Sequence, residues 1–135
     1  MKQAKAASER NKSPPRRQTS AIGIKRVYDK VARDDGVRIL IDRLWPRGLS
    51  KAELKLDAWP RALSPSNELR KWYSHDPKLF AEFRRRYRKE LAGQKEELAT
   101  LRAMIKGRKA TLLTATRELN LSHAVVLREM LEEKS

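Results

Sequence analysis

Two short apolar runs constrain the fold more than any other feature of the sequence. VRILID (37–42) is β-branched and nearly all apolar after Arg38, and ATLLTA (110–115) has a similar character. Such runs predict strands that are covered on both faces, as in parallel sheets flanked by helices. We therefore expect an α/β fold, with a small, open, mostly parallel sheet flanked by helices in a single domain.

The segments around these runs predict the remaining elements. IKRVYD (24–29) is expected to form a short strand, while Pro60 makes DAWPRAL (57–63) a weak strand or an extended link. Ser50 and Glu53 fit a capping box, which predicts the start of a short helix. Further helices are expected from Ser64-Pro65 through residue 74, from Asp76-Pro77 to Gly93, from there to Gly107, and after Asn120 as a helix N-cap.

The charge of the chain is strongly positive and unevenly spread. The net charge is +15, and residues 1–23 hold six Lys or Arg against one Glu, with almost no large apolar residue. We interpret residues 1–23 as a flexible basic N-terminal arm and residues 24–135 as the folded domain. A charge this high predicts attraction to polyanions, either as a function or as non-specific adhesion.

Composition also excludes some kinds of site and partner. The chain has no cysteine, which excludes disulfides, thiol catalysis and cysteine-ligated zinc, and fits the reducing cytoplasm in which we expect the protein. No apolar run approaches the ~20 residues of a membrane span, and none follows the N-terminal charges as in a secretory signal. The two histidines lack metal-ligand spacing and a Gly-rich phosphate loop is missing. We therefore expect no metal, no cofactor and no membrane partner.

The ends of the two apolar runs carry the candidate site. The polar residues there are Asp42, Arg43 and Arg47 after the first run, and Thr114, Thr116 and Arg117 at the second. Ligands of open α/β sheets bind beyond the carboxyl ends of the strands, so these groups would converge on one crevice if the two strands are parallel neighbours. His123 is expected beside them, in the first turn of the last helix.

We assign these side chains to two roles. Asp42 and His123 are the candidate acid–base pair, because a histidine at a helix N-terminus is disfavoured as a cation and serves as a neutral base or donor. Arg43, Arg47 and Arg117 are the candidate residues for binding an anion, since arginine can donate two parallel hydrogen bonds to it. The alternative is structural, with Asp42 capping a loop and His123 hydrogen-bonded within one.

A second candidate surface lies on the helix that contains FRRRYRKE (83–90). Its apolar stripe is formed by Phe80, Phe83, Tyr87 and Leu91. On the opposite face, Arg84, Arg85 and Arg88 are candidate contacts to nucleic-acid phosphates. The alternative is an ordinary solvated face, and the chain has no helix-turn-helix, zinc-finger or RNP-type motif.

From about Ile24 to the C-terminus, the chain resembles the domain-of-unknown-function 488 family, in its YeaO-like branch. The segments that carry the resemblance are RVYD (26–29), DGVRILIDRLWPRGLSK (35–51), SPSNELRKWYSHDP (64–77), FRRRYRKEL (83–91) and TLLTATRELNLSHAVVL (111–127). The resemblance implies a small α/β protein of cytoplasmic bacterial type and supplies no activity. Tyr73 and His75 match the family as they stand and join the candidate ligand contacts, although a histidine beside a cap and a proline, as His75 is, is more often a surface or capping residue.

This chain departs from the family pattern in its second site segment. The broader family has the form L-L-C-x-E…C-H-R there, and this chain reads LLTATRELNLSH. His123 matches the family's histidine, but the cysteines and the trailing arginine are missing, which puts thiol chemistry out of reach. Thr114 and Ser122 stand where the YeaO-like branch commonly has an aromatic residue and Asn, so the resemblance carries no role to these two.

Three hypotheses about function stay open on these grounds. The first is an enzyme or binding protein for a small phosphate- or carboxylate-bearing ligand. The second is a nucleic-acid-binding accessory protein that uses the basic arm and the face from Arg84 to Lys89. The third is a structural or interaction protein without a catalytic site. Ser122 and Thr116 have hydroxyl groups that could act as nucleophiles, but neither has an evident base, and neither the substrate nor the oligomeric state follows from the sequence.

Overall fold

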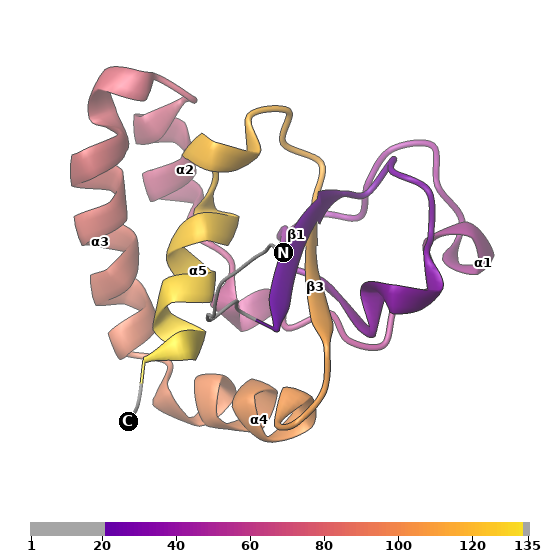
Figure 1. Ribbon diagram of the computed structural model, residues 1–135. Coiled ribbons are helices and arrows are strands. Elements are labelled where there is room, and N and C mark those ends of the chain that lie inside the picture. The colour runs from indigo at the N-terminus through magenta and orange to yellow at the C-terminus, as the bar shows by residue number, and fades with distance from the viewer. Residues whose placement is uncertain (1–20, 134–135) are drawn as a thin grey trace, which may run out of the picture.

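The computed structural model describes residues 21–133 (Figure 1). The strands are β1 (Ile22–Arg26), β2 (Val37–Leu40) and β3 (Ala110–Thr114). The helices are α1 (Lys51–Leu54), α2 (Asn67–Tyr73), α3 (Phe80–Ala92), α4 (Lys95–Ile105) and α5 (His123–Glu132). The expected small α/β fold is confirmed, with one open parallel sheet.

The sheet has the strand order β1-β3-β2, with both pairings parallel. β3 lies in the middle, and Ile22 of β1 and Val37 of β2 both lie opposite its first residue, Ala110. All residues of β2 and β3 are buried, as their apolar runs predict. Because the strands are parallel neighbours, the residues that follow β2 and β3 emerge at the same edge of the sheet.

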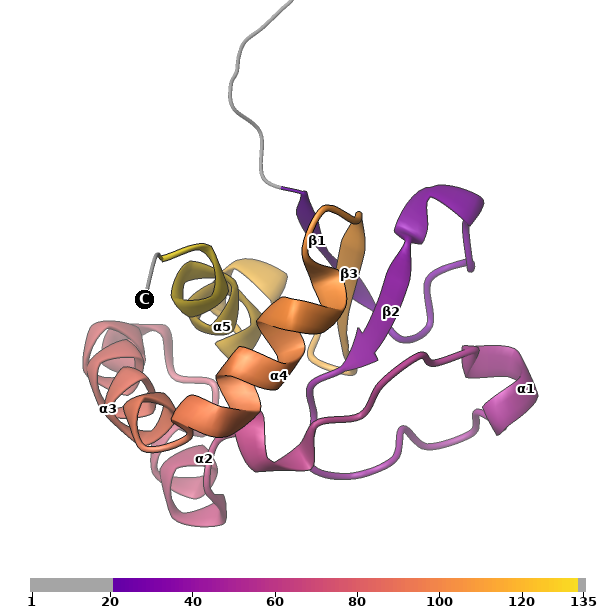
Figure 2. The ribbon, with the colours of Figure 1, turned by 90° about the horizontal axis from the view of Figure 1, so that it is seen from below.

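The two faces of the sheet are covered by different parts of the chain (Figure 2). Successive strand residues point to opposite faces, so Ile39 and Leu40 enter different apolar clusters. The larger cluster packs α2, α3, α4 and α5 against Ile39 and Leu112. The smaller cluster packs the segment 45–59, which contains α1, against Leu40 and Leu113. The long segment after β2 is therefore held against the sheet close to the candidate site.

Local signals in the sequence account for several helix starts. The capping box at α1 is formed as predicted, with the Glu53 N–H donating to Ser50 Oγ and the Ser50 N–H donating to Glu53 Oε1. Asp76 accepts a hydrogen bond from the Lys78 N–H and begins the 3₁₀ turn Pro77–Leu79, which continues into α3.

Within residues 21–133, no helix is long and apolar enough to cross a membrane.

Several element boundaries differ from those expected. β1 begins at Ile22, two residues earlier, because the carbonyl of Ala21 accepts from the Ala110 N–H and extends the ladder. Of residues 57–63, expected to be a weak strand or an extended link, the first part is extended with a single parallel bridge from Ala58 to Ile39, but Arg61–Leu63 form a 3₁₀ turn. The N-cap of α5 is Ser122 and not Asn120, since residues 119–121 form a 3₁₀ turn first. Residues 1–20 of the expected arm lie outside the described residues.

Candidate functional site

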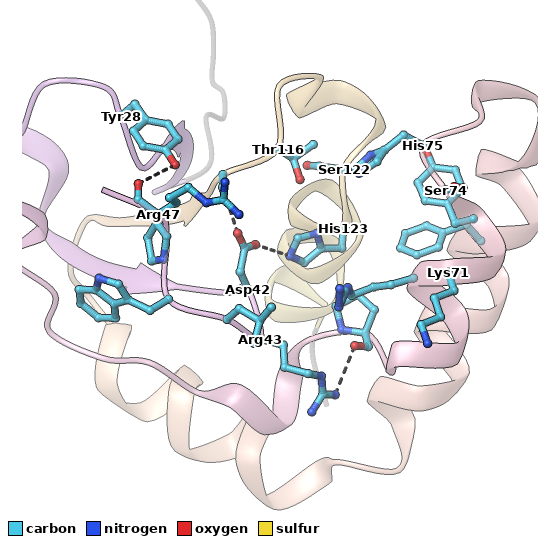
Figure 3. Close-up of a pocket in the computed structure, with 18 residues that line it drawn as sticks. Tyr28, Asp42, Arg43, Arg47, Lys71, Ser74, His75, Thr116, Ser122 and His123 are labelled. Atoms are coloured by element: carbon cyan, nitrogen blue, oxygen red, sulfur yellow. Dashed lines mark hydrogen bonds and ion pairs between the residues drawn. The ribbon is translucent and has the colours of Figure 1, made fainter. Parts of the chain in front are cut away.

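A cavity of about 500 Å³ opens at the carboxyl edge of the sheet (Figure 3). Its walls come from the loop after β2, the end of α2 with the turn after it, the loop after β3 and the first turn of α5. The predicted residues that it brings together are Asp42, Arg43, Arg47, Tyr73, His75, Thr116, Ser122 and His123. Arg117 is exposed and does not belong to this lining.

The Asp42 carboxylate is fixed by donors from β3 and α5. Its Oδ1 accepts from Thr114 Oγ1 at 2.7 Å, and its Oδ2 accepts from the Ala115 N–H at 2.8 Å. Nε2 of His123 lies 3.1 Å from Oδ1. Burial acts to raise the pKa of Asp42, but the hydrogen bonds from His123, Ala115 and Thr114 outweigh it and hold the pKa below its ordinary value of 3.8. Both oxygens of this carboxylate are therefore engaged by the protein itself.

The contacts of His123 indicate which ring nitrogen carries the proton. Nε2 lies 3.0 Å from the carbonyl oxygen of Ile41 as well as close to Asp42. Both neighbours accept hydrogen bonds, so Nε2 is the protonated nitrogen of the neutral ring. Nδ1 has no hydrogen-bond partner within residues 21–133, which leaves its lone pair as an acceptor. Asp42 thus orients the imidazole, and the imidazole presents Nδ1.

The two arginines of the loop after β2 lie differently. Arg43 turns toward Pro65 and donates to its carbonyl oxygen from Nη2 at 3.3 Å, while its buried Nε has no partner among the described residues. Arg47 is exposed, and its carbonyl oxygen accepts from the Tyr28 hydroxyl at 3.1 Å. The Arg47 guanidinium has no ion-pair partner in the described part of the chain. Both arginines line the cavity, and Arg47 is the one whose guanidinium has no hydrogen bond to the described residues.

Two indole rings hold this loop in place. Trp59 donates from Nε1 to the carbonyl oxygen of Asp42 at 2.7 Å, and Trp45 donates to that of Leu49 at 2.6 Å. The two rings meet edge to face, with centroids 5.4 Å apart. The backbone that carries Asp42 is therefore fixed by side-chain hydrogen bonds as well as by β2.

The end of α2 supplies cations that the sequence interpretation missed. Arg70 and Lys71 line the cavity, Arg70 with a long contact of 3.3 Å to Asn67 Oδ1 and Lys71 with no ion pair among residues 21–133. Both lie in ELRKWYSHDP, one of the segments that resemble the family, but nothing local indicated which face of the helix they occupy. Asp42 is the one acidic residue among the described residues that line the cavity.

Tyr73 and His75 lie on the same wall of the cavity, but Tyr73 is buried and His75 is exposed. Tyr73 is buried, stacks on Phe83 with centroids 4.3 Å apart and donates to the carbonyl oxygen of Leu121 at 2.7 Å. Burial, with a contribution from Asp76, raises the pKa of Tyr73, which keeps the hydroxyl a donor. His75 is exposed, and it follows Ser74 in a turn where both have positive φ, 46° and 59°. Tyr73 therefore positions the wall, and His75 faces solvent at its rim.

Comparisons with known proteins identify the family. A family model described as "Inactive DUF488-N3 subclade" matches residues 21–135. The chain belongs to the DUF488 family. It is 43% identical to "Uncharacterized protein YeaO" of Escherichia coli (strain K12) over 110 residues, which cover 82% of this chain and 96% of the relative. It is 42% identical to "Uncharacterized protein Rv3073c" of Mycobacterium tuberculosis (strain ATCC 25618 / H37Rv) over 110 residues, covering 82% and 92%. No solved structure matches it.

The two candidate nucleophiles of this DUF488 chain, the hydroxyl groups of Ser122 and Thr116, are not paired with His123. Ser122 Oγ donates to the Leu119 carbonyl at 2.7 Å and accepts from the Ala124 N–H, so it acts as the helix cap. Thr116 Oγ1 contacts Thr114 Oγ1 at 3.2 Å. Within residues 21–133, neither hydroxyl is hydrogen-bonded to His123, and no group of three or more His, Asp or Glu residues is arranged to hold a metal ion.

The basic face of α3 is largely ion-paired. Nη2 of Arg84 lies 2.8 Å from Oε1 of Glu129. Nη2 of Arg85 lies 2.6 Å from Oε2 of Glu82, and Nη2 of Arg88 lies 2.5 Å from Oε2 of Glu133. Two of these glutamates come from α5 and its C-terminal end, far away in the sequence. This face therefore presents less free positive charge to a phosphate backbone than the run of arginines predicts.

Proposed function

We propose that this protein is a binding protein for a small phosphate- or carboxylate-bearing ligand, held in the cavity at the carboxyl edge of the sheet. The charge of the lining carries the proposal. Four Lys or Arg side chains line the cavity against one carboxylate, Asp42, whose oxygens are occupied by protein donors. A concave site lined by positive charges attracts anions and repels cations.

Arg47 and Lys71 are the proposed anion contacts. They come from different walls, on the two sides of the Asp42–His123 pair (Figure 3). Arg47 offers a planar fork of N–H donors that matches a carboxylate or phosphate, and Lys71 offers a mobile ammonium group. The acceptor Nδ1 of His123 suits a hydroxyl group of the ligand or a protonated phosphate oxygen.

Binding without turnover is the form of this function that the site favours. Neither Ser122 nor Thr116, the hydroxyl groups that line the cavity as candidate nucleophiles, is hydrogen-bonded to His123 within residues 21–133, and Asp42 is committed to orienting His123. The subclade to which the chain belongs is described as inactive, and this chain has no cysteine in the segment where the broader family has two. The Asp42–His123 pair therefore serves recognition in our proposal and not proton transfer.

A thermal-shift screen of the full chain tests the proposal. Inorganic phosphate, sugar phosphates, nucleotides and small carboxylates are compared with chloride at the same ionic strength. A ligand that binds only the folded state stabilises it, by about 2.7 kcal/mol when its concentration is 100 times Kd. We expect at least one of these anions to raise Tm above the chloride control.

Variants that each remove one positive charge distinguish binding in the cavity from attraction to the overall positive charge of the protein. Lys71→Ala and Arg47→Ala should each weaken binding of the anion found in the screen by roughly tenfold, since a charge-assisted hydrogen bond is worth about 1.5–3 kcal/mol. Lys89→Ala removes one charge from an exposed position of α3 outside the lining and should leave Kd unchanged. The proposal fails if no anion exceeds chloride, or if all three variants weaken binding equally.

A further inference from the structure

The large apolar side chains that are exposed within residues 21–133 both line the same cavity. Of the large hydrophobic residues that the structure describes, the exposed ones are Tyr28, 46% exposed, and Leu44, 69% exposed. Both line the cavity, Tyr28 from the turn after β1 and Leu44 from the loop after β2. Isolated exposed apolar residues are common on protein surfaces. Two that line the same cavity as the four cations indicate a ligand with an apolar part.

The Tyr28 ring is held in place although it is half exposed. Its hydroxyl donates to the carbonyl oxygen of Arg47, and the Arg26 guanidinium carbon lies 5.1 Å from the ring centroid. Arg26 is itself fixed, since it donates to the carbonyl oxygens of Thr116 and Ala115 at 3.2 and 3.1 Å. A ring fixed in advance loses little conformational entropy when another planar group stacks on it.

We infer that the ligand joins its anionic group to a planar aromatic group, and that the aromatic group lies against Tyr28 and Leu44 at the mouth of the cavity. The inference rests on the proposed function and specifies its ligand. Figure 3 shows Tyr28 beside Arg47, with Lys71 on the far side of Asp42 and His123. A ring placed on Tyr28 therefore leaves the anionic group inside the cavity, between cations.

The size of the cavity agrees with such a ligand. Its volume of about 500 Å³ lies within the range of roughly 300–1,000 Å³ in which small-molecule sites fall. Nucleoside monophosphates, aryl phosphates and aromatic carboxylates share the required chemistry. Inorganic phosphate and aliphatic carboxylates lack the aromatic part.

Matched ligand pairs test the inference by calorimetric titration of the full chain. The pairs are AMP with ribose 5-phosphate, phenyl phosphate with methyl phosphate, and benzoate with acetate. Each pair keeps the anionic group and removes the aromatic ring. We expect the aromatic member of at least one pair to bind roughly tenfold more tightly, because stacking on an aromatic side chain contributes enough binding free energy for a difference of this size.

Variants of Tyr28 and Leu44 test whether these residues cause the preference for the aromatic ligand. Tyr28→Ala should reduce the binding of the aromatic ligand to that of its non-aromatic partner, and any loss that both ligands share through the hydroxyl contact with Arg47 is measured by Tyr28→Phe. Tyr28→Phe keeps the ring and loses only the hydroxyl contact with Arg47, so it should retain the preference. Leu44→Ala should halve the preference or reduce it further, and it provides a second readout if Tyr28→Ala does not fold.

The outcomes separate this inference from the proposed function. If the non-aromatic anions bind as tightly as their aromatic partners, and Tyr28→Ala and Leu44→Ala change neither, the inference is overturned and the proposed function stands. If no member of any pair binds more tightly than chloride, both are overturned. A preference that persists in both variants would place the aromatic group elsewhere and would also overturn the inference.

Discussion

Nε2 of His123, the first residue of α5, lies 3.1 Å from Oδ1 of Asp42, which follows β2. The contact joins the last helix to the loop that carries Arg47, and β3 completes it through Thr114 and the Ala115 N–H. Three separate elements therefore depend on a single carboxylate at the floor of the cavity. Its removal should affect stability as well as any binding.

Asp42→Asn should lower the free energy of unfolding by about 1–3 kcal/mol. The amide has one acceptor oxygen in place of two, so at least one of the three donors around it loses its partner in a partly buried site. Urea unfolding followed by circular dichroism measures the change. Asp34→Asn, at an exposed position, is the control and should shift the midpoint little. Equal midpoints for the two variants would contradict the prediction.

The lowered pKa of Asp42 predicts how stability depends on pH. A carboxyl group whose pKa is lower in the folded than in the unfolded protein stabilises the fold above its unfolded pKa, about 3.9 for Asp. That contribution is lost as pH falls through the folded pKa. Between pH 5 and pH 2.5, wild type should therefore lose more stability than Asp42→Asn, so that their urea midpoints converge. Curves that remain parallel across this interval would refute the assignment.

Gly36→Ala should destabilise the protein far more than Gly48→Ala. Both glycines have positive φ, 67° and 83°, which costs an alanine roughly 1–2 kcal/mol. A Cβ at Gly36 would also lie 2.1 Å from the carbonyl oxygen of Lys109, whereas one at Gly48 would meet no atom within 4 Å. The start of β2 would have to move away from the residue before β3. Thermal unfolding of the two variants measures the difference, and similar Tm values would contradict it.

Trp59→Phe should cost about 1 kcal/mol of stability and weaken ligand binding. Phenylalanine keeps an aromatic ring near Trp45 but loses the hydrogen bond to the carbonyl of Asp42. The matched control is Trp72→Phe, because no hydrogen bond of the Trp72 indole is found within residues 21–133. Urea unfolding and anion titration of both variants test the role of the indole. Equal effects on binding would show that Trp59 does not position the loop.

The sequence by itself determined the class of the fold and most of the segments that line the candidate cavity. Apolar runs without alternation, such as 37–42 and 110–115, are stable only when both faces of a strand are covered, which implies a sheet between two layers. Short-range interactions determined the start of α1 and of the turn before α3, because Ser50 and Asp76 bond to residues two or three positions away. The parallel arrangement then brought Asp42 and Thr114 together.

Only the tertiary structure decided which polar side chains face the cavity and which of them are bonded to other groups of the protein. Arg43 is directed to Pro65, Arg117 lies apart, and Arg70 and Lys71 enter the lining from α2. Arg84 and Arg88 of α3 are paired with Glu129 of α5 and Glu133 after it, which no local pattern could reveal. Periodicity and capping depend on neighbours within about one helical turn, whereas these contacts join residues that only the folding of distant segments brings together.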